Sequence, residues 1–475
     1  MTMAKWLILL AFLQLPACSE APSFSATDLL TDTATDFTGE GSGDLAITNV
    51  RVAMNPGNVL SRTLDFDTEV PTAATLSIHC DGELVGEFSS EQDPTRVHSA
   101  FVMGLIPNSA CTVHISVASD SMQGSYSADF SVDSPPDFLP ELPLLDSSDL
   151  EEERFTLFNL TNSFDEIPLI VVVVDSKGRY RWYHQRATTD PGSDTDVRTT
   201  PQGVLIGGSH GQIMPALISW EGQVVWEKQA NMHHDLRYFP DANQYQYLVD
   251  VKGCQQEFSS GAIVRIDADT LDPVWEWRIC EHYTPAELVS DWSHVNTAAP
   301  FGDDDALLVS SRNQNAVFKV WRDSGDLAWK LGEDGAFTLP PNAHFYHQHD
   351  PAVLDDGTIL MFDNGLVGTR ESSRALQLAI DEQNMSAEVV WEYNPSPEIF
   401  APIWGDADRL ANGNTLVVFG QRSATKRSRI VEVAPSGNEV WGLVLPEKWG
   451  VYRAQRLETL EAGHFSPTKS ESKER

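Results

Sequence analysis

Three histidines stand out because each opens a strand-like run at a similar interval along the chain. They are His234, His294 and His349, and the intervals between them are 60 and 55 residues. Imidazole groups can act as nucleophiles or move protons near neutral pH. Asn296 follows His294 by two residues and so shares its face of a strand. Arg312 ends the next run, LLVSSR, and an antiparallel return would bring it level with His294.

These five side chains together suit the binding of an oxyanion. A guanidinium presents a planar fork of donors that matches the oxygens of sulfate or phosphate. Three imidazoles can also bind a metal ion, but a guanidinium among the ligands would repel a cation. We therefore predict an oxyanion site without a metal. The structural alternative is that the histidines only hydrogen-bond the loops around them.

The polar neighbours of these residues are harder to place. His233 precedes another histidine, and consecutive strand residues point to opposite faces, so its assignment as a substrate contact is ambiguous. The same alternation predicts that Asp235 and Asp350 point away from the site. His344 and His347 fall in a loop, where a structural role is favoured.

A repeat of six units indicates the scaffold that carries these residues. Each unit is a β-rich run followed by a turn and a strand with tryptophan, and the tryptophans are 44, 49, 54, 62 and 50 residues apart. A period of about 40 to 60 residues is typical of a β-propeller, whereas a stacked β-solenoid has shorter, more regular periods. We predict an all-β chain with a six-bladed β-propeller over residues 154–460. The tryptophans are Trp182, Trp226, Trp275, Trp329, Trp391 and Trp441.

The first strand of a propeller blade lines the central channel, so residues at the start of these strands should converge at one mouth. The final run YRAQRL, residues 452–457, has the pattern of one more such strand. It is predicted to complete the first blade and close the ring, which removes the free sheet edges. Arg453 and Arg456 on this run either add a positive field at the mouth or are solvated surface charges.

The residues before the propeller divide into four segments. Residues 1–18 resemble a secretory leader that ends in LPAC, similar to a bacterial lipobox, which predicts a lipid on Cys18. The alternative is an ordinary signal peptide. Residues 19–43 are predicted to be a tether, and residues 134–153 a Pro-rich linker. Residues 44–133 alternate like a small β-sandwich, and GLIPNSACTVHISV resembles part of a fibronectin type III domain.

Export would place the chain where disulfide bonds form. The leader predicts a periplasmic or cell-surface location, and Ser19 after Cys18 favours anchoring to the outer membrane over the inner membrane. The other cysteines predict the disulfides Cys80–Cys111 and Cys254–Cys280, with buried free thiols as the alternative. A net charge of -37 argues against nucleic acid as a partner. Residues 461–475 are predicted to be a disordered tail.

Several stretches resemble the bacterial arylsulfate sulfotransferase family, in the same order along the chain. The most specific are DW-x-H-x-N, an SSR arginine 18 residues after His294, and QHD followed by FDNG. The resemblance implies an exported six-bladed propeller that moves a sulfuryl group from a phenolic sulfate to a phenol without a cofactor. It also implies that His349 is the nucleophile. His294, Asn296, Arg312 and His234 match the remaining site positions.

The chain departs from the family pattern in one place, and other readings remain open. Better-known members carry a cysteine pair in the loop before the QH strand, and this chain has none there. The implied mechanism is ping-pong, with a sulfohistidine at His349 and either His294 or His234 as the acid-base group. The alternatives are a sulfate or phosphate ester hydrolase on the same site, and a propeller that only binds a ligand or a protein.

Overall fold

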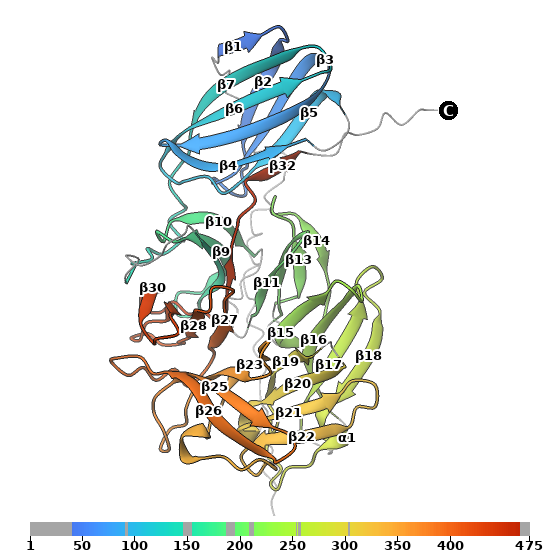
Figure 1. Ribbon diagram of the computed structural model, residues 1–475, viewed down its shortest axis with the longest axis vertical. Coiled ribbons are helices and arrows are strands. Elements are labelled where there is room, and N and C mark those ends of the chain that lie inside the picture. The colour runs from blue at the N-terminus through green and yellow to red at the C-terminus, as the bar shows by residue number, and fades with distance from the viewer. Residues whose placement is uncertain are drawn as a thin grey trace, which may run out of the picture.

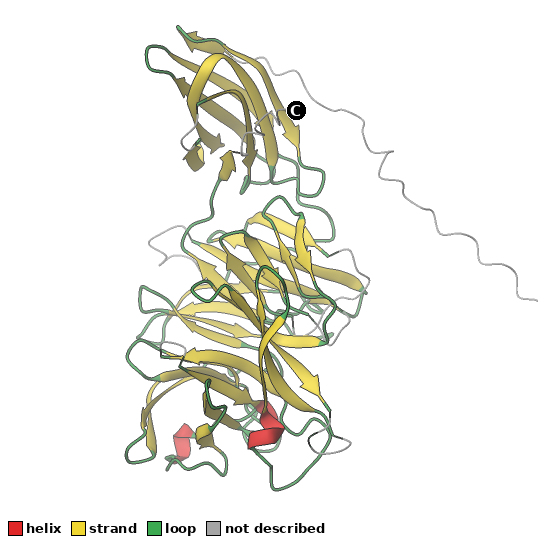
Figure 2. Cartoon of the chain, turned by 90° about the vertical axis from the view of Figure 1, so that its right-hand side faces the viewer, coloured by secondary structure: helices red, strands yellow, loops and turns green. Residues whose placement is uncertain are grey.

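The computed structural model describes residues 40–90, 94–145, 154–186, 195–208, 213–252, 254, 258–302 and 305–465. Cys18 and the leader lie outside these residues, as do most of the predicted tether and tail. Strands dominate the described chain, as Figures 1 and 2 show. Its only helical pieces are α1 (Ile279–His282) and the 3-10 segments η1 (Arg312–Gln314) and η2 (Pro341–Ala343). None of the described helices is long and apolar enough to cross a membrane.

Six four-stranded antiparallel sheets form the ring of a β-propeller, which confirms the predicted fold and not the solenoid. Their strands, from the channel outward, are blade 1, β31 (Ala454–Leu457), β8 (Phe155–Asn162), β9 (Ile167–Asp175) and β10 (Tyr180–Gln185); blade 2, β11 (Val197–Thr200), β12 (Gly203–Ile206), β13 (Ala216–Ile218) and β14 (Val224–Glu227); blade 3, β15 (Met232–Phe239), β16 (Gln244–Val251), β17 (Ser260–Asp267) and β18 (Pro273–Arg278); blade 4, β19 (Val295–Phe301), β20 (Ala306–Ser311), β21 (Ala316–Trp321) and β22 (Leu327–Gly332); blade 5, β23 (His349–Val353), β24 (Ile359–Asp363), β25 (Arg374–Asp381) and β26 (Ser386–Tyr393); blade 6, β27 (Asp406–Arg409), β28 (Thr415–Phe419), β29 (Arg429–Val433) and β30 (Glu439–Val444).

The ring closes as predicted, because the last propeller strand joins the first blade. Strand β31 pairs antiparallel with β8, with Ala454 opposite Phe158. All six marker tryptophans lie in the outer strand of a blade. Three of these marker tryptophans, and also Trp277, donate an indole hydrogen bond to a carbonyl in the outer turn of the next blade. The pairs are Trp182 to Trp220, Trp277 to Gly325, Trp391 to Pro435 and, across the ring closure, Trp441 to Ser176.

The middle strands carry the apolar core between the blades. Six consecutive residues of β9, from Leu169 to Val174, are fully buried, as expected for a strand covered on both faces. Buried side chains of adjacent blades form shared clusters, such as Leu360 and Phe362 of blade 5 with Val417 and Phe419 of blade 6. Packing between blades therefore holds the inner strands, and the side chains at their ends, in a fixed ring.

The N-terminal unit is built around one long strand, β3 (Arg62–Cys80). Its first half pairs with β2 and β5, and its second half with β4 and β6. Cys80 and Cys111 face each other in register and are disulfide-bonded, as predicted. The likeness to fibronectin type III stays a prediction. The other strands are β1 (Glu40–Gly43), β2 (Ile47–Met54), β4 (Glu83–Ser89), β5 (Thr95–Val102), β6 (Ala110–Ala118) and β7 (Gln123–Ser131).

The two ends of the propeller chain are more ordered than predicted. Within the predicted tail, β32 (Gly463–Phe465) pairs with β5 of the N-terminal unit, so the tail prediction was wrong for these residues. Within the predicted linker, Leu145 donates a backbone hydrogen bond to Gly442 of β30. The ion pairs Arg179–Glu83 and His464–Glu221 connect the two units. Backbone pairing explains both differences, because composition alone does not reveal a partner strand.

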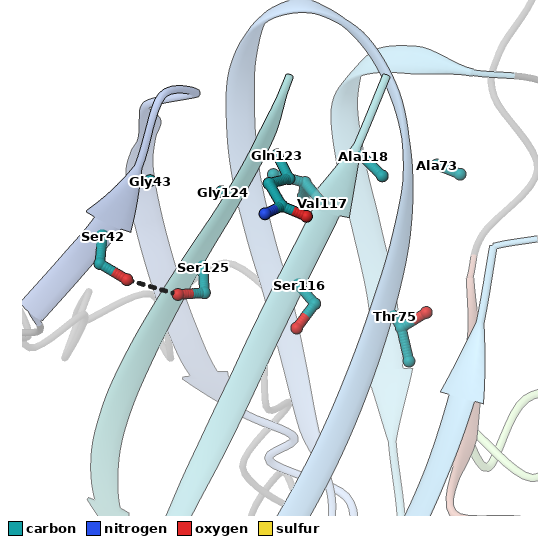
Figure 3. Close-up of a pocket in the computed structure, with 10 residues that line it drawn as sticks. All are labelled: Ser42, Gly43, Ala73, Thr75, Ser116, Val117, Ala118, Gln123, Gly124 and Ser125. Carbon is teal, nitrogen blue, oxygen red and sulfur yellow. Dashed lines mark hydrogen bonds between the residues drawn. The ribbon is translucent and has the colours of Figure 1, made fainter. Parts of the chain in front are cut away.

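A hollow of about 410 Å³ lies on the N-terminal unit between β1, β7, β6 and β3 (Figure 3). Its most polar feature is the hydrogen bond of 2.9 Å between the hydroxyls of Ser42 and Ser125. The ten lining residues are small, apolar or neutral, and none of them carries a titratable side chain. This hollow therefore offers no titratable group for acid-base chemistry.

Candidate active site

The three histidines predicted to converge do meet at the start of the inner strands of blades 3, 4 and 5. The ring centroids of His234 and His294 are 5.0 Å apart, and those of His234 and His349 are 6.4 Å apart. The blade period predicted this arrangement, since equivalent positions in adjacent blades face the same channel. The alternative that the three histidines serve separate loops does not account for their mutual contact.

Each of these inner strands breaks its regular pairing at the histidine. The register shifts between His233 and Leu236, between Val295 and Thr297, and between His349 and Ala352. A β-bulge re-aims side chains and interrupts the alternation of faces. The backbone at these breaks is left-handed, with φ of 64° at His234, 40° at His294 and 43° at Asp350.

The bulges overturn one prediction. Asp235 and Asp350 were expected to point away from the site because strand residues alternate. Both are instead buried in the channel directly beneath the histidines that precede them, and both contact Arg453. The break in β15 holds two extra residues and the break in β23 holds one, so the alternation of faces is interrupted and two consecutive side chains face the channel on the same strand.

His349 is the most strongly defined member of the site. It is 2 % exposed, and its Nδ1 lies 2.7 Å from Oδ1 of Asn364. The Asn364 amide nitrogen donates to the carbonyls of Ala401 and Trp404, which fixes its oxygen toward the histidine. Since that oxygen can only accept, Nδ1 of the neutral ring carries the proton and Nε2 keeps a free lone pair.

The charge state of His349 agrees with this role. Burial first, and then the positive charge of Arg312, lower the pKa of His349 to about 3, against the opposing effect of its hydrogen bond to Asn364. The ring is therefore neutral across the physiological range. A neutral imidazole with a fixed tautomer is a competent nucleophile.

His294 is paired with a carboxylate. Its Nδ1 lies 2.5 Å from Oδ2 of Asp291, three residues earlier. A carboxylate on one ring nitrogen orients the ring and favours a proton on it, so Nε2 is left to exchange protons with a ligand. The His294 side chain is 25 % exposed, which leaves it the more accessible of the two histidines. This pair has the composition of an acid-base dyad.

His234 is hydrogen-bonded to its neighbour His233. The Nδ1 atoms of His233 and His234 are 2.7 Å apart, so one donates to the other. Nε2 of His233 faces Asp250 at 3.5 Å. Both nitrogens of His233 are thus directed at protein groups, and its contact with a substrate stays a prediction.

Arg312 lies at the mouth, as the hairpin geometry predicted. Its backbone N–H donates to the carbonyl of His294 at 3.1 Å. Its guanidinium reaches from blade 4 to the carbonyl of Pro402, before blade 6. The pKa of His347 is lowered to about 4, mainly by burial and secondly by the charge of Arg312. The positive charge of Arg312 therefore acts on both His347 and His349.

Asn296 is hydrogen-bonded to the segment that carries His349. Its Nδ2 donates to the carbonyl of Gln348 at 2.8 Å, directly before His349. The Gln348 amide in turn donates to Ser310 and to the carbonyls of Ser311 and Ala316. These bonds fasten blade 5 to blade 4 at the site. Direct contact of Asn296 with a substrate stays a prediction.

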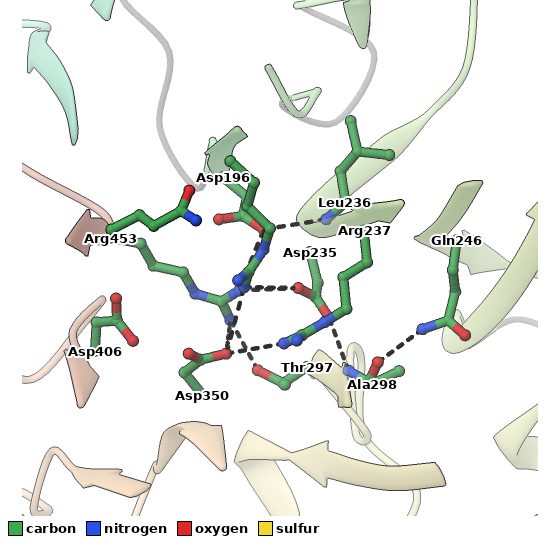
Figure 4. A network of polar contacts seen from close by, with 12 residues as sticks. Asp196, Asp235, Leu236, Arg237, Gln246, Thr297, Ala298, Asp350, Asp406 and Arg453 are labelled. Atoms are coloured by element: carbon green, nitrogen blue, oxygen red, sulfur yellow. Dashed lines mark hydrogen bonds and ion pairs between the residues drawn. The ribbon is translucent and has the colours of Figure 1, made fainter. Parts of the chain in front are cut away.

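A buried network of aspartates and arginines includes the residues that follow His234 and His349 (Figure 4). Arg453 is 2 % exposed, so it is neither a solvated charge nor a group at the mouth. The carboxylates Asp350, Asp406 and Asp408 lie close enough to hold a metal ion. Arginines already occupy that space, since Arg237 and Arg453 both contact Asp350 at 3.2 and 3.1 Å. We assign no metal to this cluster.

The sequence model of the arylsulfotransferase (ASST) family matches residues 145–453, about two thirds of the chain. The chain belongs to the arylsulfotransferase family. The match covers the propeller up to Arg453 and includes every site residue described above. It leaves the N-terminal unit outside the family region.

Curated relatives agree with this membership. The chain is 28% identical over 167 residues to the arylsulfate sulfotransferase AssT of Escherichia coli, covering 27% of this chain and 28% of that protein. It is 28% identical over 351 residues to the AssT of Lelliottia amnigena, covering 54% of this chain and 58% of that protein. The matched parts thus span less than two thirds of either relative.

Comparison with solved structures is less informative than the family match. One example is the periplasmic gluconolactonase PpgL of Pseudomonas aeruginosa, with 11% identity, a TM-score of 0.39 and coverage of 81% of this chain and 99% of that one. A likeness this weak carries no argument about the site or its chemistry.

Three site residues escaped the sequence analysis. Asn364 lies in the FDNG motif, but only the fold brings it onto a ring 15 residues earlier. Asp291 is the aspartate of DW-x-H-x-N and pairs with its own histidine. Tyr452 packs its ring 5.8 Å from His234 and 6.3 Å from His349. Its position before the closing strand, equivalent to the histidines in other blades, was the available signal.

The second predicted disulfide is also present. Cys254 and Cys280 are bonded, with their Cα atoms 5.8 Å apart. Cys280 belongs to α1, which leads into the loop that carries Asp291 and His294. The bond therefore ties the segment before the His294 dyad to the turn after β16.

Proposed function

We propose that this protein is a nucleotide-independent aryl sulfotransferase that works through a sulfohistidine at His349. The observation that carries the proposal is the Asn364–His349 pair, which directs a neutral Nε2 lone pair into a site that also holds Arg312 and the His294–Asp291 dyad. Family membership supports the substrate class: phenolic sulfate esters as donors and phenols as acceptors.

In the first half-reaction, Nε2 of His349 attacks the sulfur of the donor. An N–S bond forms and the bond between sulfur and the phenolic oxygen breaks. A protonated His294 gives its Nε2 proton to the leaving oxygen, so a phenol departs and His294 becomes neutral. Arg312 and His234 donate hydrogen bonds to the sulfuryl oxygens while charge shifts in the transition state.

The second half-reaction reverses these roles. Neutral His294 takes the proton of an incoming phenol, whose oxygen attacks the sulfur as the N–S bond breaks. The acceptor leaves as a sulfate ester, and His349 and His294 return to their starting states. One site that serves both halves implies ping-pong kinetics.

The test is incubation of the purified protein with 4-nitrophenyl sulfate, with and without phenol, followed by intact mass measurement. Transfer predicts nitrophenol release that depends on phenol, and a mass gain of one sulfuryl group when phenol is withheld. Release without phenol would instead support a hydrolase that uses water in the second half. No release and no mass gain with several aryl sulfates would overturn the proposal and favour a propeller that only binds a ligand or a protein.

A further inference from the structure

Arg453 connects four neighbouring blades from the strand that closes the ring. Its Nη1 lies 2.9 Å from Asp235 and 3.4 Å from Asp196. Its Nη2 lies 3.1 Å from Asp350, 2.8 Å from the hydroxyl of Thr297 and 3.2 Å from the carbonyl of Asn296. These partners belong to blades 2, 3, 4 and 5, and Arg453 itself leads into β31 of blade 1 (Figure 4).

The sixth blade joins the same arrangement through the backbone. The N–H of Ala454 donates to Oδ2 of Asp406, the first residue of β27, at 3.2 Å. Each inner strand therefore contributes one residue to a layer directly below the histidines. The members of this layer are Asp196, Asp235, Asn296, Asp350, Asp406 and Arg453.

The layer is one residue away from the groups that would do the chemistry. Asp235 follows His234, Asp350 follows His349, and Arg453 follows Tyr452. Because the bulges place both members of each pair in the channel, a shift of either carboxylate moves the attached histidine. Arg453 and Arg237 each bridge Asp235 and Asp350, the residues that follow His234 and His349, and only Arg453 also reaches Thr297 of blade 4 among the described contacts.

The charges around Arg453 explain why this position needs a guanidinium. Five carboxylates, three guanidiniums and no other described charged side chain make up the buried network, so its charges do not balance. The arginines lower the pKa of Asp235 and Asp350, whereas burial raises the pKa of Asp406 and brings that of Asp408 to about 6. The network consists of Asp196, Asp235, Asp350, Asp406, Asp408, Arg198, Arg237 and Arg453.

We propose that Arg453 is a positioning residue of the active site, which holds His234 and His349 in register through Asp235 and Asp350. This rests on the proposed function for its kinetic consequence. Arg453 does not touch the reacting atoms and acts only through the residues that it fastens. Ring closure by β31 and assembly of the site are then one event.

The same strand offers a matched control. Arg456 is also buried, with a side chain 3 % exposed, and is ion-paired with Glu432 at 2.6 Å and bonded to the hydroxyl of Thr156 at 2.7 Å. None of its contacts is a member of the layer below the histidines. Arg456→Lys therefore disturbs the closing strand and a buried ion pair, but not the positioning contacts.

The experiment compares Arg453→Lys and Arg456→Lys in melting temperature, steady-state kinetics and intact mass. A lysine cannot bridge five partners at once, so we expect Arg453→Lys to lower kcat by about 10- to 100-fold, the scale of a small misplacement of catalytic groups. KM should change little, and sulfohistidine formation should slow in parallel. We expect Arg456→Lys to keep a kcat within about threefold of the unmodified protein when both variants lose similar stability. Equal losses of kcat in the two variants would overturn the proposal in favour of a purely structural role.

A second readout does not depend on activity. In protein with isotope-labelled histidine, Arg453→Lys should shift the imidazole resonances of His234 and His349, assigned by His→Gln variants, whereas Arg456→Lys should not. Should the unmodified protein neither transfer nor become labelled, the proposed function fails, and the resonances still decide the role of Arg453. Unshifted resonances in Arg453→Lys would overturn that role.

Discussion

Nδ1 of His349 lies 2.7 Å from Oδ1 of Asn364, and the amide of Asn364 is in turn held by two backbone carbonyls. This chain of contacts settles which nitrogen of the buried histidine faces the channel with a lone pair. The Nδ1 atom of His294 instead lies against a carboxylate, that of Asp291. The two histidines therefore have partners of different charge, which suits the proposed roles of His349 as nucleophile and His294 as proton carrier.

Replacement of the nucleophile should separate chemistry from folding. We expect His349→Ala to reduce phenol-dependent transfer to background and to abolish the sulfuryl mass gain, because alanine lacks the ring nitrogen that would bond to sulfur. The far-UV circular dichroism spectrum should be unchanged. His344→Ala, at an exposed loop position in the same segment, is the control and should retain activity. Substantial transfer by His349→Ala would refute the assignment.

The Asn364 contact can be tested by the pH dependence of the reaction. The pKa of His349 is lowered to about 3, so protonation of the nucleophile does not limit activity above about pH 5. In Asn364→Asp a carboxylate would face Nδ1, stabilise the imidazolium and raise this pKa. We expect the acidic limb of kcat/KM to move upward, with activity lost at pH 5 before it is lost at pH 8. An acidic limb that does not move would show that Asn364 does not control the charge of His349.

Asp291 should matter for proton transfer more than for binding. Without the carboxylate, the ring of His294 loses the partner that orients it, so we expect Asp291→Asn to lower kcat by about 10- to 100-fold. The loss should be smaller for donors with good leaving groups, such as 4-nitrophenyl sulfate, than for phenyl sulfate. An equal loss with both donors would contradict a role of the dyad in protonating the leaving oxygen.

Arg312 should supply transition-state stabilisation that lysine cannot replace. Loss of one such donor typically costs about 10²- to 10³-fold in rate. We expect a loss of this size in kcat for Arg312→Met and nearly the same for Arg312→Lys, because the fork geometry is lost in both. Arg322→Lys, on an arginine that follows the outer end of β21, is the control. Full activity in Arg312→Lys would show that charge alone suffices.

The depressed pKa of His349 also predicts a change of stability with pH. The unfolded chain binds a proton at this histidine near pH 6.5, whereas the folded protein resists protonation until about pH 3. Its contribution to stability is therefore present above about pH 6.5 and falls as the pH decreases through this window. Other groups titrate here too, including His347, and Asp408 with the opposite sign. The measurement is thus the difference between the unmodified protein and His349→Gln. The melting temperature of the unmodified protein should fall more steeply between pH 7 and pH 4.5, and parallel curves would contradict the prediction.

The sequence by itself determined the ring and its chemical content. Tryptophans at blade intervals predicted six outer strands, and histidines at the same interval predicted the convergence of His234, His294 and His349. This periodicity can be recognised from local sequence, because each blade is built from hairpins between strands that are close in the chain. The arginine of SSR could be placed at the mouth for the same reason, since it lies one hairpin from His294.

Only the tertiary structure decided how these groups are aimed and held. The bulges that turn Asp235 and Asp350 into the channel break the alternation on which a strand is read from sequence. The contacts of Asn364 with His349, and of Arg453 with partners more than a hundred residues earlier, arise when blades pack and the last strand closes the ring. Such contacts join residues that no local pattern relates, so their pairing becomes visible only in three dimensions.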